Sequence, residues 1–370
     1  MDRFSPADCR YMARALQLAR RGMTTAHPNP RVGCVLVQGD RIVGEGWHRY
    51  AGEAHAEVNA LAAAGTRAVG ATAYVTLEPC SHTGRTGPCT EALIRGRIAE
   101  VIFALEDPSP EASGRARELL EEAGVRVSSG LMETAAGKLN EGFIMRLRRQ
   151  RPFVRVKVAA SLDGATAMRN GESRWITGDA ARRDVQRLRA TCGAIMTGIG
   201  TVVADDPLLT VRQPEMRNQP LRAVIDSRLR TPANAKLLEQ PGETVLFCIA
   251  DGGERQKALE SAGAMVRRVA AAQGRVDLPA VLEELARLQV NDLLVEAGPV
   301  LAGALLAGNL VDELVIYQAP HTMGGETLRM FDTPEWTRLI HRRRLHITDT
   351  RRVGKDLRIL ARPLAPEEPH

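Results

Sequence analysis

Short apolar runs typical of β-strands alternate with helix-like segments along most of this chain, and this alternation restricts the possible folds more than any other feature. It is typical of α/β proteins, in which helices pack against the faces of a sheet. In the first 150 residues it predicts strands over residues 32–38, 41–48, 72–78, 100–105 and 125–129, the first two joined as a hairpin. It predicts helices that begin at Ser5–Pro6 and that span residues 54–65, 88–96, 113–124 and 132–149.

The basic segment RLRRQRP, residues 146–152, interrupts this alternation, which starts again at Phe153. Taken alone, such a segment is more often a solvated helix end than a binding site. A chain of 370 residues is also longer than most single domains. We therefore predict two α/β domains, residues 1–146 and 147–366. Further strands are expected over residues 153–161, 194–198, 221–227, 244–250, 264–270, 292–298 and 313–320.

The composition favours a cytoplasmic protein with an anionic partner. No run of about 18 apolar residues is present, and the charged N-terminus lacks the apolar core of a signal peptide. The net charge of +6 suits a phosphorylated small molecule or nucleic acid, but an aromatic content of 4% is low for a surface that stacks bases. We therefore predict no membrane and no nucleic-acid partner. A homo-oligomer is the general expectation.

Two of the six cysteines lie in the stretch LEPCSHTGRTGPC, residues 77–89. Cytoplasmic cysteines rarely form disulfides, so metal binding or simple burial remains. His55 opens a predicted helix, Cys80 follows a strand and Cys89 opens another helix; one imidazole and two thiolates suit Zn²⁺. Three protein ligands leave a position for water, and Glu57 is placed to shuttle its proton. The alternative is a closed structural site with His82 as fourth ligand.

The pair H-x-E and P-C…C is the signature of zinc deaminases, although eight residues here separate Cys80 from Cys89. Together with HPNPRVG (27–33), GWHRYAGEAHAEVNAL (46–61) and EPCSHTGRTGPC (78–89), it resembles the bifunctional pyrimidine deaminase/reductase family of riboflavin biosynthesis. The resemblance extends over most of the chain. It implies a cytidine-deaminase-like three-layer first domain in which His55, Cys80 and Cys89 bind zinc and Glu57 is catalytic. It also implies substrate contacts from Asn29 and His82, with His48 as a further candidate.

Glycine-containing turns follow two predicted strands of the second half, at Gly198–Gly200 and at Gly298. Backbone N–H groups at such a turn into a helix bind anions, although helix–strand packing explains a single turn equally well. Neither turn has the G-x-G-x-x-G pattern of a Rossmann fold. Two such turns, with a third strand ending at Ser227, suggest a dinucleotide that lies across strand ends.

The second half contains KVAASLDGATAM (157–168), GESRWIT (171–177), DVQRLRA (184–190), ADDPLLTVR (204–212) and VEAG (295–298), which resemble the reductase half of the same family. The resemblance implies a dihydrofolate-reductase-like α/β domain that uses NADPH. It places at the cofactor Ala159, Trp175, Thr201, Asp205, Ser227, Gly298, Pro299, Val300, Leu301, Ala302, Gly303 and Ala304. It places at the substrate Ser173, Arg189, Leu209, Arg212 and Glu296.

Several of these residues have plainer interpretations. Arg189 and Arg212 suit a substrate phosphate, because guanidinium groups pair bidentately with phosphate, but both are also ordinary surface charges. The plainer interpretation of Trp175 is core packing. Pro299 departs from a simple cofactor turn, because proline has no backbone N–H to donate. Ser227, with Arg228 and Arg230 after it, suits the 2′-phosphate of NADPH, whereas Asp226 would favour the 2′-hydroxyl of NADH.

The resemblance implies two consecutive reactions. The first is the zinc-dependent hydrolytic deamination of 2,5-diamino-6-(5-phosphoribosylamino)pyrimidin-4(3H)-one. The second is NADPH-dependent reduction of the ribosyl group to ribityl, for which Lys157, Asp163, Glu296 or water could supply the proton. Two alternatives remain open. One is a nucleic-acid deaminase with a basic C-terminal RNA-binding domain, and the other is a monofunctional deaminase whose second domain only binds a ligand.

Overall fold

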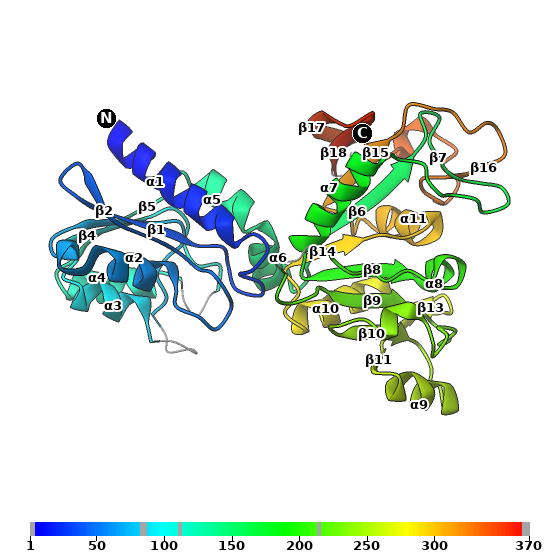
Figure 1. Ribbon diagram of the computed structural model, residues 1–370, viewed down its shortest axis with the longest axis horizontal. Coiled ribbons are helices and arrows are strands. Elements are labelled where there is room, and N and C mark those ends of the chain that lie inside the picture. Colours follow the sequence, from blue (N-terminus) through cyan, green and yellow to red (C-terminus); the bar gives the residue numbers. More distant parts are fainter. Residues whose placement is uncertain (1–3, 82–86, 110–112, 213–215, 365–370) are drawn as a thin grey trace. The chain divides into compact units, whose positions relative to one another are not determined.

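The computed structural model describes residues 4–81, 87–109, 113–212 and 216–364. The chain divides into two compact units, Met1–Gln150 and Arg151–His370 (Figure 1). The division falls slightly after the predicted boundary, because the last helix of the first unit continues to Arg149. No helix among the described residues is both long and apolar enough to cross a membrane.

The first unit contains a five-stranded sheet in the order β2-β1-β3-β4-β5. The predicted hairpin is present, with β1 antiparallel to both β2 and β3, while β3, β4 and β5 run parallel. Helices cover both faces of this sheet, so the unit has three layers (Figure 1). The strands are β1 (Gly33–Gln38), β2 (Arg41–Trp47), β3 (Thr72–Val75), β4 (Glu100–Phe103) and β5 (Arg126–Ser129). The helices are α1 (Pro6–Ala19), α2 (Ala56–Ala64), α3 (Cys89–Arg95), α4 (Arg115–Glu122), α5 (Glu133–Leu139) and α6 (Glu141–Arg149).

The single helix predicted over residues 132–149 is wrong, because it is divided into α5 and α6 at Asn140. The buried Asn140 side chain accepts a hydrogen bond from the Arg31 amide at 2.8 Å and donates one to the Arg31 carbonyl at 3.0 Å. Asparagine side chains that bond to backbone groups compete with helix formation. The two hydrogen bonds to Arg31 also fix the chain close to Asn29, one of the predicted substrate residues.

The second unit contains a nine-stranded sheet in the order β11-β10-β9-β8-β14-β6-β15-β18-β17. Its strands run parallel from β11 to β15, and β18 and β17 add an antiparallel edge. The strands of this sheet are β6 (Phe153–Ala160), β8 (Ala194–Gly198), β9 (Leu221–Ile225), β10 (Thr244–Cys248), β11 (Ala264–Arg268), β14 (Asp292–Val295), β15 (Glu313–Gln318), β17 (Leu345–Val353) and β18 (Asp356–Pro363). The helices are α7 (Asp179–Ala190), α8 (Ile199–Asp205), α9 (Glu254–Ser261), α10 (Leu278–Arg287) and α11 (Pro299–Ala307).

All seven strands predicted for this unit are present, most of them shorter than expected, but several were missed. The antiparallel pair β17–β18 was not predicted, and neither were two small ladders outside the main sheet. These ladders are β7 (Ala165–Met168) with β16 (Thr327–Arg329), and β12 (Ala271–Ala272) with β13 (Arg275–Val276). Because β9, β8, β14 and β6 are parallel neighbours, their carboxyl ends meet at one edge of the sheet. In open parallel sheets this edge is where ligands bind.

Candidate functional site

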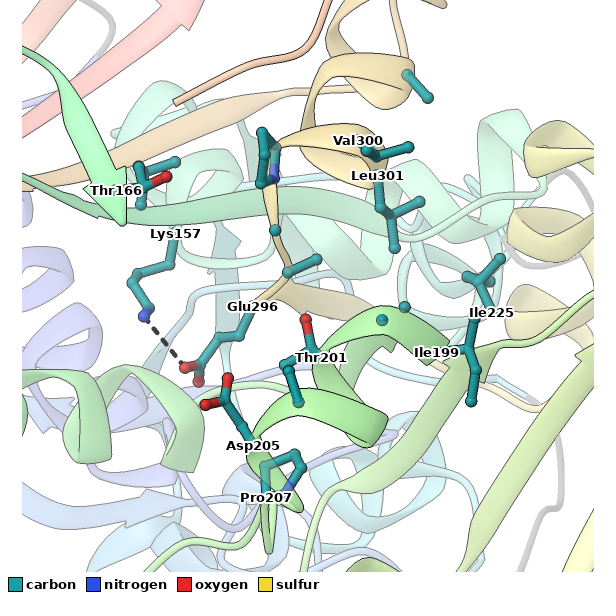
Figure 2. A pocket seen from close by; sticks show the side chains of 18 of the residues that line it. Lys157, Thr166, Ile199, Thr201, Asp205, Pro207, Ile225, Glu296, Val300 and Leu301 are labelled. Atoms are coloured by element: carbon teal, nitrogen blue, oxygen red, sulfur yellow. Dashed lines mark ion pairs between the residues drawn. The ribbon is translucent and has the colours of Figure 1, made fainter. Parts of the chain in front are cut away.

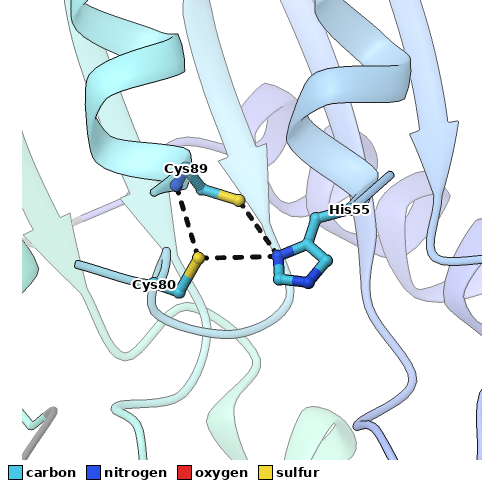
Figure 3. A group of neighbouring side chains, drawn as sticks. All are labelled: His55, Cys80 and Cys89. Atoms are coloured by element: carbon cyan, nitrogen blue, oxygen red, sulfur yellow. Dashed lines mark hydrogen bonds between the residues drawn. The ribbon is translucent and has the colours of Figure 1, made fainter. Parts of the chain in front are cut away.

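Three predicted zinc ligands converge in the first unit (Figure 3). His55 is the N-cap of α2, Cys89 is the first residue of α3, and Cys80 lies in the loop after β3. The His55 Nδ1 atom lies 3.3 Å from Cys89 Sγ and 3.5 Å from Cys80 Sγ, and all three ligand atoms lie within 4.8 Å of one another. Tetrahedral zinc, with bonds of about 2.3 Å to sulfur and 2.0–2.1 Å to nitrogen, separates such atoms by roughly 3.6 Å. The observed spacing therefore fits zinc.

The start of α3 stabilises one of these sulfurs as a thiolate. The Cys89 backbone N–H donates a hydrogen bond to Cys80 Sγ at 3.3 Å. A hydrogen bond from the Cys89 side chain, together with the nearby His55, lowers the pKa of Cys80 to about 4. The same sulfur–sulfur contact raises the pKa of Cys89. Of the two sulfurs, Cys80 is therefore the one whose thiolate is favoured, as expected for a cysteine near a helix start.

Glu57 is buried in the first turn of α2, with 3% of its surface exposed. Burial raises the pKa of its carboxyl to about 7, and the Cys80 thiolate adds to this effect. A carboxyl group whose pKa lies near neutrality can both take and return a proton. Its position two residues after the His55 cap places it at the same helix start as the ligand, as the sequence predicted.

Asn29 lies beside this centre and is connected to it through His48. The His48 Nδ1 atom is 3.3 Å from the Ala54 carbonyl, which can only accept, so Nε2 is left to accept from the Asn29 amide at 3.0 Å. The His48 ring then meets the His55 ring edge-on, with centroids 5.2 Å apart. Asn29 is therefore held close to the predicted metal. His82 lies outside the described residues.

Glu78 is a site residue that the sequence did not identify. Its side chain is buried, and its carboxylate accepts hydrogen bonds from the backbone amides of Asp107, Gly114 and Ala116 at 3.0, 3.1 and 3.2 Å. Two of these amides belong to the start of α4, where a carboxylate is favoured. Glu78 thereby fixes the chain two residues before Cys80. The only signal in the sequence was an acidic residue directly after an apolar strand.

The second unit has a large pocket, of about 2460 Å³, at the carboxyl edge of its sheet (Figure 2). It brings together residues from the ends of β8, β9 and β14, from β6 and from the turn into α11. The predicted residues that line it are Ala159, Ser173, Trp175, Arg189, Thr201, Asp205, Leu209, Arg212, Ser227, Glu296, Gly298, Pro299, Val300, Leu301 and Ala304.

Ala302 and Gly303 do not line this pocket. Ala302 is buried with 1% of its surface exposed, and a side chain at Gly303 would meet the Asp332 carbonyl oxygen at 2.0 Å. In this part of α11 the small residues allow close packing against the segment that contains Asp332. The sequence prediction placed Ala302 and Gly303 at the cofactor together with the rest of the turn. In the structure both residues lie on the side of α11 that is packed and does not face the pocket.

A half-buried ion-pair network lines the pocket. Glu296 follows β14 and pairs with Lys157, whose Nζ lies 3.3 Å from the carboxylate (Figure 2). Arg189 Nε lies 2.5 Å from the same carboxylate, and Arg189 also donates to the Thr210 carbonyl. Burial alone would raise the pKa of Glu296, but the two cations outweigh it and lower the pKa to about 2. The carboxyl therefore stays ionised and accepts hydrogen bonds only.

Other predicted residues form the rim of the pocket. Trp175 is 69% exposed, with the Arg182 guanidinium stacked 4.4 Å from its ring centroid, which excludes the interpretation of Trp175 as core packing. Asp205 pairs with Arg174 at 3.0 Å. Leu209 is buried and has a φ of 51°, a strained conformation for leucine that often marks functional sites.

Comparisons with known proteins show the family of both units. Residues 5–105 match the model of the cytidine and deoxycytidylate deaminase zinc-binding region, and residues 152–359 match that of the RibD C-terminal domain. The riboflavin biosynthesis protein RibD of Escherichia coli K12 is 47% identical over 94% of this chain and 97% of that protein. The corresponding protein of Haemophilus influenzae is 41% identical over 97% of this chain and 98% of its own length.

Solved structures agree over nearly the whole length. RibD of Acinetobacter baumannii has a TM-score of 0.91 at 41% identity, covering 97% of this chain and 99% of that chain. The diaminohydroxyphosphoribosylaminopyrimidine deaminase/5-amino-6-(5-phosphoribosylamino)uracil reductase of Thermotoga maritima has a TM-score of 0.86 at 29% identity over the same shares. The predicted fold of both domains is confirmed, and so are zinc and NADPH as cofactors. The chain belongs to the RibD family of bifunctional deaminase–reductases of riboflavin biosynthesis.

Proposed function

We propose that the first unit deaminates 2,5-diamino-6-(5-phosphoribosylamino)pyrimidin-4(3H)-one with zinc held by His55, Cys80 and Cys89. Zinc bound there would activate a water for attack on C2 of the pyrimidine ring, the carbon whose amino group is lost. Glu57 takes the proton of that water and returns it to the departing amine, which leaves as ammonia. Asn29, held by His48 beside the metal, orients the ring. A role for His82 in the same task rests on the resemblance of its loop alone.

The second unit then reduces the deaminated product, and Lys157 is the proton donor that its geometry favours. NADPH supplies the hydride to C1′ of the ribosyl group. Glu296 has a pKa of about 2 and holds no proton to give near neutral pH. Asp163 accepts from the Ser161 hydroxyl and from the Met323 and Gly324 amides, and it does not line the pocket. Lys157 lines the pocket and can give a proton to the ribose ring oxygen as the ring opens.

Arg212 is the better candidate for the substrate phosphate. Arg189 already pairs with Glu296 through two nitrogens and donates a third hydrogen bond to Thr210. The exposed Arg212 side chain lines the same pocket and has no ion pair or hydrogen bond to any described residue. Its guanidinium group therefore remains available for bidentate pairing with a phosphate. Arg189 instead orients Glu296.

We also propose a cytoplasmic location and a homo-oligomer. The location rests on the reduced cysteines, which suit a reducing compartment. The oligomer is supported by β17, the edge strand of the nine-stranded sheet, of which residues 345–352 are all exposed. A long exposed edge strand presents unpaired backbone groups with which a strand of another chain can pair.

The convergence of His55, Cys80 and Cys89 beside the buried Glu57 carries this proposal. Glu57→Gln should retain zinc, keep NADPH oxidation with the deaminated intermediate, and lose deamination by about 10²–10⁴-fold. The matched control is Glu53→Gln, which changes an exposed glutamate just before the ligand. Zinc content, ammonia release and NADPH oxidation are measured on the same purified chain. Loss of zinc from Glu57→Gln would make Glu57 a ligand and contradict its assigned role.

A further inference from the structure

A small hairpin forms one wall of the pocket, near the end of β9. Strands β12 and β13 pair through Ala271–Val276 and Ala272–Arg275, and the Asp277 amide donates to the Ala270 carbonyl at 2.9 Å. The connecting residues Gln273 and Gly274 have φ angles of 50° and 71°. Positive φ at both central residues is typical of the tight two-residue turns that join antiparallel strands. The hairpin therefore presents the exposed Arg275 from a defined backbone.

The hairpin is fastened to the end of β9 by Ser227. Its hydroxyl oxygen accepts a hydrogen bond from the Val276 amide at 3.1 Å. Because Arg228 follows Ser227 and Arg275 precedes Val276, this contact brings the two arginines to neighbouring backbone positions. Arg228, Arg230 and Arg275 all line the pocket, together with Gln273 and Gly274.

These arginines differ from three others that line the pocket. Arg174, Arg182 and Arg189 each pair with a carboxylate. Arg228, Arg230 and Arg275 are exposed, and none has an ion pair or hydrogen bond to any described residue. Three cationic side chains that line one wall of a pocket without a protein partner indicate a site for an anion.

No carboxylate among the described residues pairs with these three arginines, and the nearby ones are engaged elsewhere. Asp226 has no exposed surface, and its Oδ2 accepts from both the amide and the hydroxyl of Thr231, at 2.7 and 2.8 Å. Its Oδ1 is buried as well, so a ribose hydroxyl cannot reach it. Asp277 caps α10 through the Ala280 amide. Asp206, which also lines the pocket, pairs with Lys236 at 3.2 Å.

We propose that the β12–β13 hairpin selects NADPH over NADH, with Arg275 and Arg228 binding the 2′-phosphate of the adenosine. Ser227 is a positioning residue: it holds the hairpin so that both guanidinium groups meet the same phosphate. This inference rests on the proposed reductase function, because it concerns the cofactor of that reaction. It goes beyond the sequence prediction, which had Ser227, Arg228 and Arg230 but neither the hairpin nor Arg275.

Calorimetry with two nucleotides isolates the 2′-phosphate from the rest of the cofactor. The wild-type chain should bind 2′,5′-ADP more tightly than 5′-AMP by about 10-fold or more, because a charged hydrogen bond contributes that much to affinity. Arg275→Ala should remove most of this difference by weakening 2′,5′-ADP alone. Arg268→Ala, an exposed arginine on β11 outside the pocket lining, is the matched control and should leave both affinities unchanged.

Ser227 is tested separately. Ser227→Ala should reduce the preference for 2′,5′-ADP and increase hydrogen exchange at the hairpin, and Ser227→Thr, which keeps the hydroxyl, should restore both. The proposal is overturned if Arg275→Ala keeps the full preference, or if it weakens 5′-AMP equally. Failure of the reductase function would show differently, as an absence of NADPH oxidation in the wild-type chain.

Discussion

The two sites of this chain are built in opposite ways. The zinc centre consists of three side chains whose ligand atoms lie within 4.8 Å, supplied by two helix starts and the loop after one strand. The reductase pocket is a volume of about 2460 Å³ assembled from the ends of several parallel strands and the loops between them. In the first site each residue has one task, whereas in the second some charged residues pair with one another and others have no charged partner among the described residues.

This difference has consequences for how each site fails. A metal site loses its metal when one of three ligands is removed, so its response should be close to all-or-none. The reductase pocket contains paired charges such as Lys157 with Glu296, and unpaired ones such as Arg275. Changes there should be graded according to whether the residue moves a proton, holds a neighbour or contacts the cofactor. The predictions below test this contrast, starting with the largest effect.

Cys80→Ser should abolish stoichiometric zinc binding and reduce deamination by more than about 100-fold, since loss of even an outer partner of a metal ligand costs about 10–100-fold. Reduction of the deaminated intermediate by NADPH should continue unchanged, because Cys80 belongs to the first unit. Zinc content and the two activities are measured in parallel. Cys9→Ser, which changes an exposed thiol in α1, is the control. An equal loss of reductase activity would show that the activity of the second unit depends on the zinc centre of the first, which contradicts the expected independence.

Lys157→Met should reduce the NADPH-dependent step by about 10²–10⁴-fold, the usual contribution of a positioned proton donor. Deamination and zinc content should be unaffected. Lys236→Met is the control, because Lys236 also lines the pocket but is more exposed and pairs with Asp206. Single-turnover reduction with each variant separates the chemical step from cofactor binding. If both variants reduce the substrate equally well, water supplies the proton and the role of Lys157 is wrong.

The contrast also explains what could be predicted from the sequence. The zinc ligands follow from a short pattern, because each lies where a predicted helix begins or a predicted strand has ended. The ion pair between Arg189 and Glu296 joins residues 107 positions apart, and no local pattern reports such a contact. The roles of the pocket residues therefore came from family resemblance. Their membership of one pocket became visible only once the order of the parallel strands was known.

Two features of the fold were predicted wrongly or missed, because the sequence around them carries no strong local signal. The helix over residues 132–149 has suitable helical spacing, but Asn140 divides it to bond with Arg31, 109 positions away. The β12–β13 hairpin was missed because its strands are two residues long, and a turn of Gln273 and Gly274 lacks the asparagine or aspartate that usually marks it. In both cases the deciding interaction is a long-range contact or a backbone geometry without a strong local signal.

Glu78→Gln should destabilise the first unit by about 1.5–3 kcal/mol, because it replaces charge-assisted hydrogen bonds to three backbone amides. The glutamine also places an N–H₂ group where acceptors are needed. Glu91→Gln is the control: it removes an exposed pair with Arg95 worth about 0.3–0.5 kcal/mol. Hydrogen exchange of α4 and β4 in increasing denaturant reports the unfolding free energy of this unit. Equal effects of the two variants would contradict the anchoring role of Glu78.

The smallest expected effect concerns acid stability in the second unit. Lys157 and Arg189 overcome the effect of burial and lower the pKa of Glu296 to about 2, below the value of about 4.3 expected in the unfolded chain. A lowered pKa stabilises the folded state above the unfolded value, and this stabilisation is lost as the pH falls from about 5 toward 2. Between pH 7 and pH 4 the stabilisation lost through Glu296 should be roughly 0.6 kcal/mol.

Glu296→Gln isolates this contribution. The variant should be less stable at pH 7, because it leaves two buried cations without their carboxylate, and the deficit relative to wild type should narrow as the pH falls to 4. The matched comparison is Glu326→Gln, an exposed partner of Arg169 whose deficit should stay near zero. Hydrogen exchange of β6 and β14 at each pH reports the unfolding free energy. A deficit that is constant with pH would mean that Glu296 titrates alike in both states, and that the pocket does not hold its charges as a linked network.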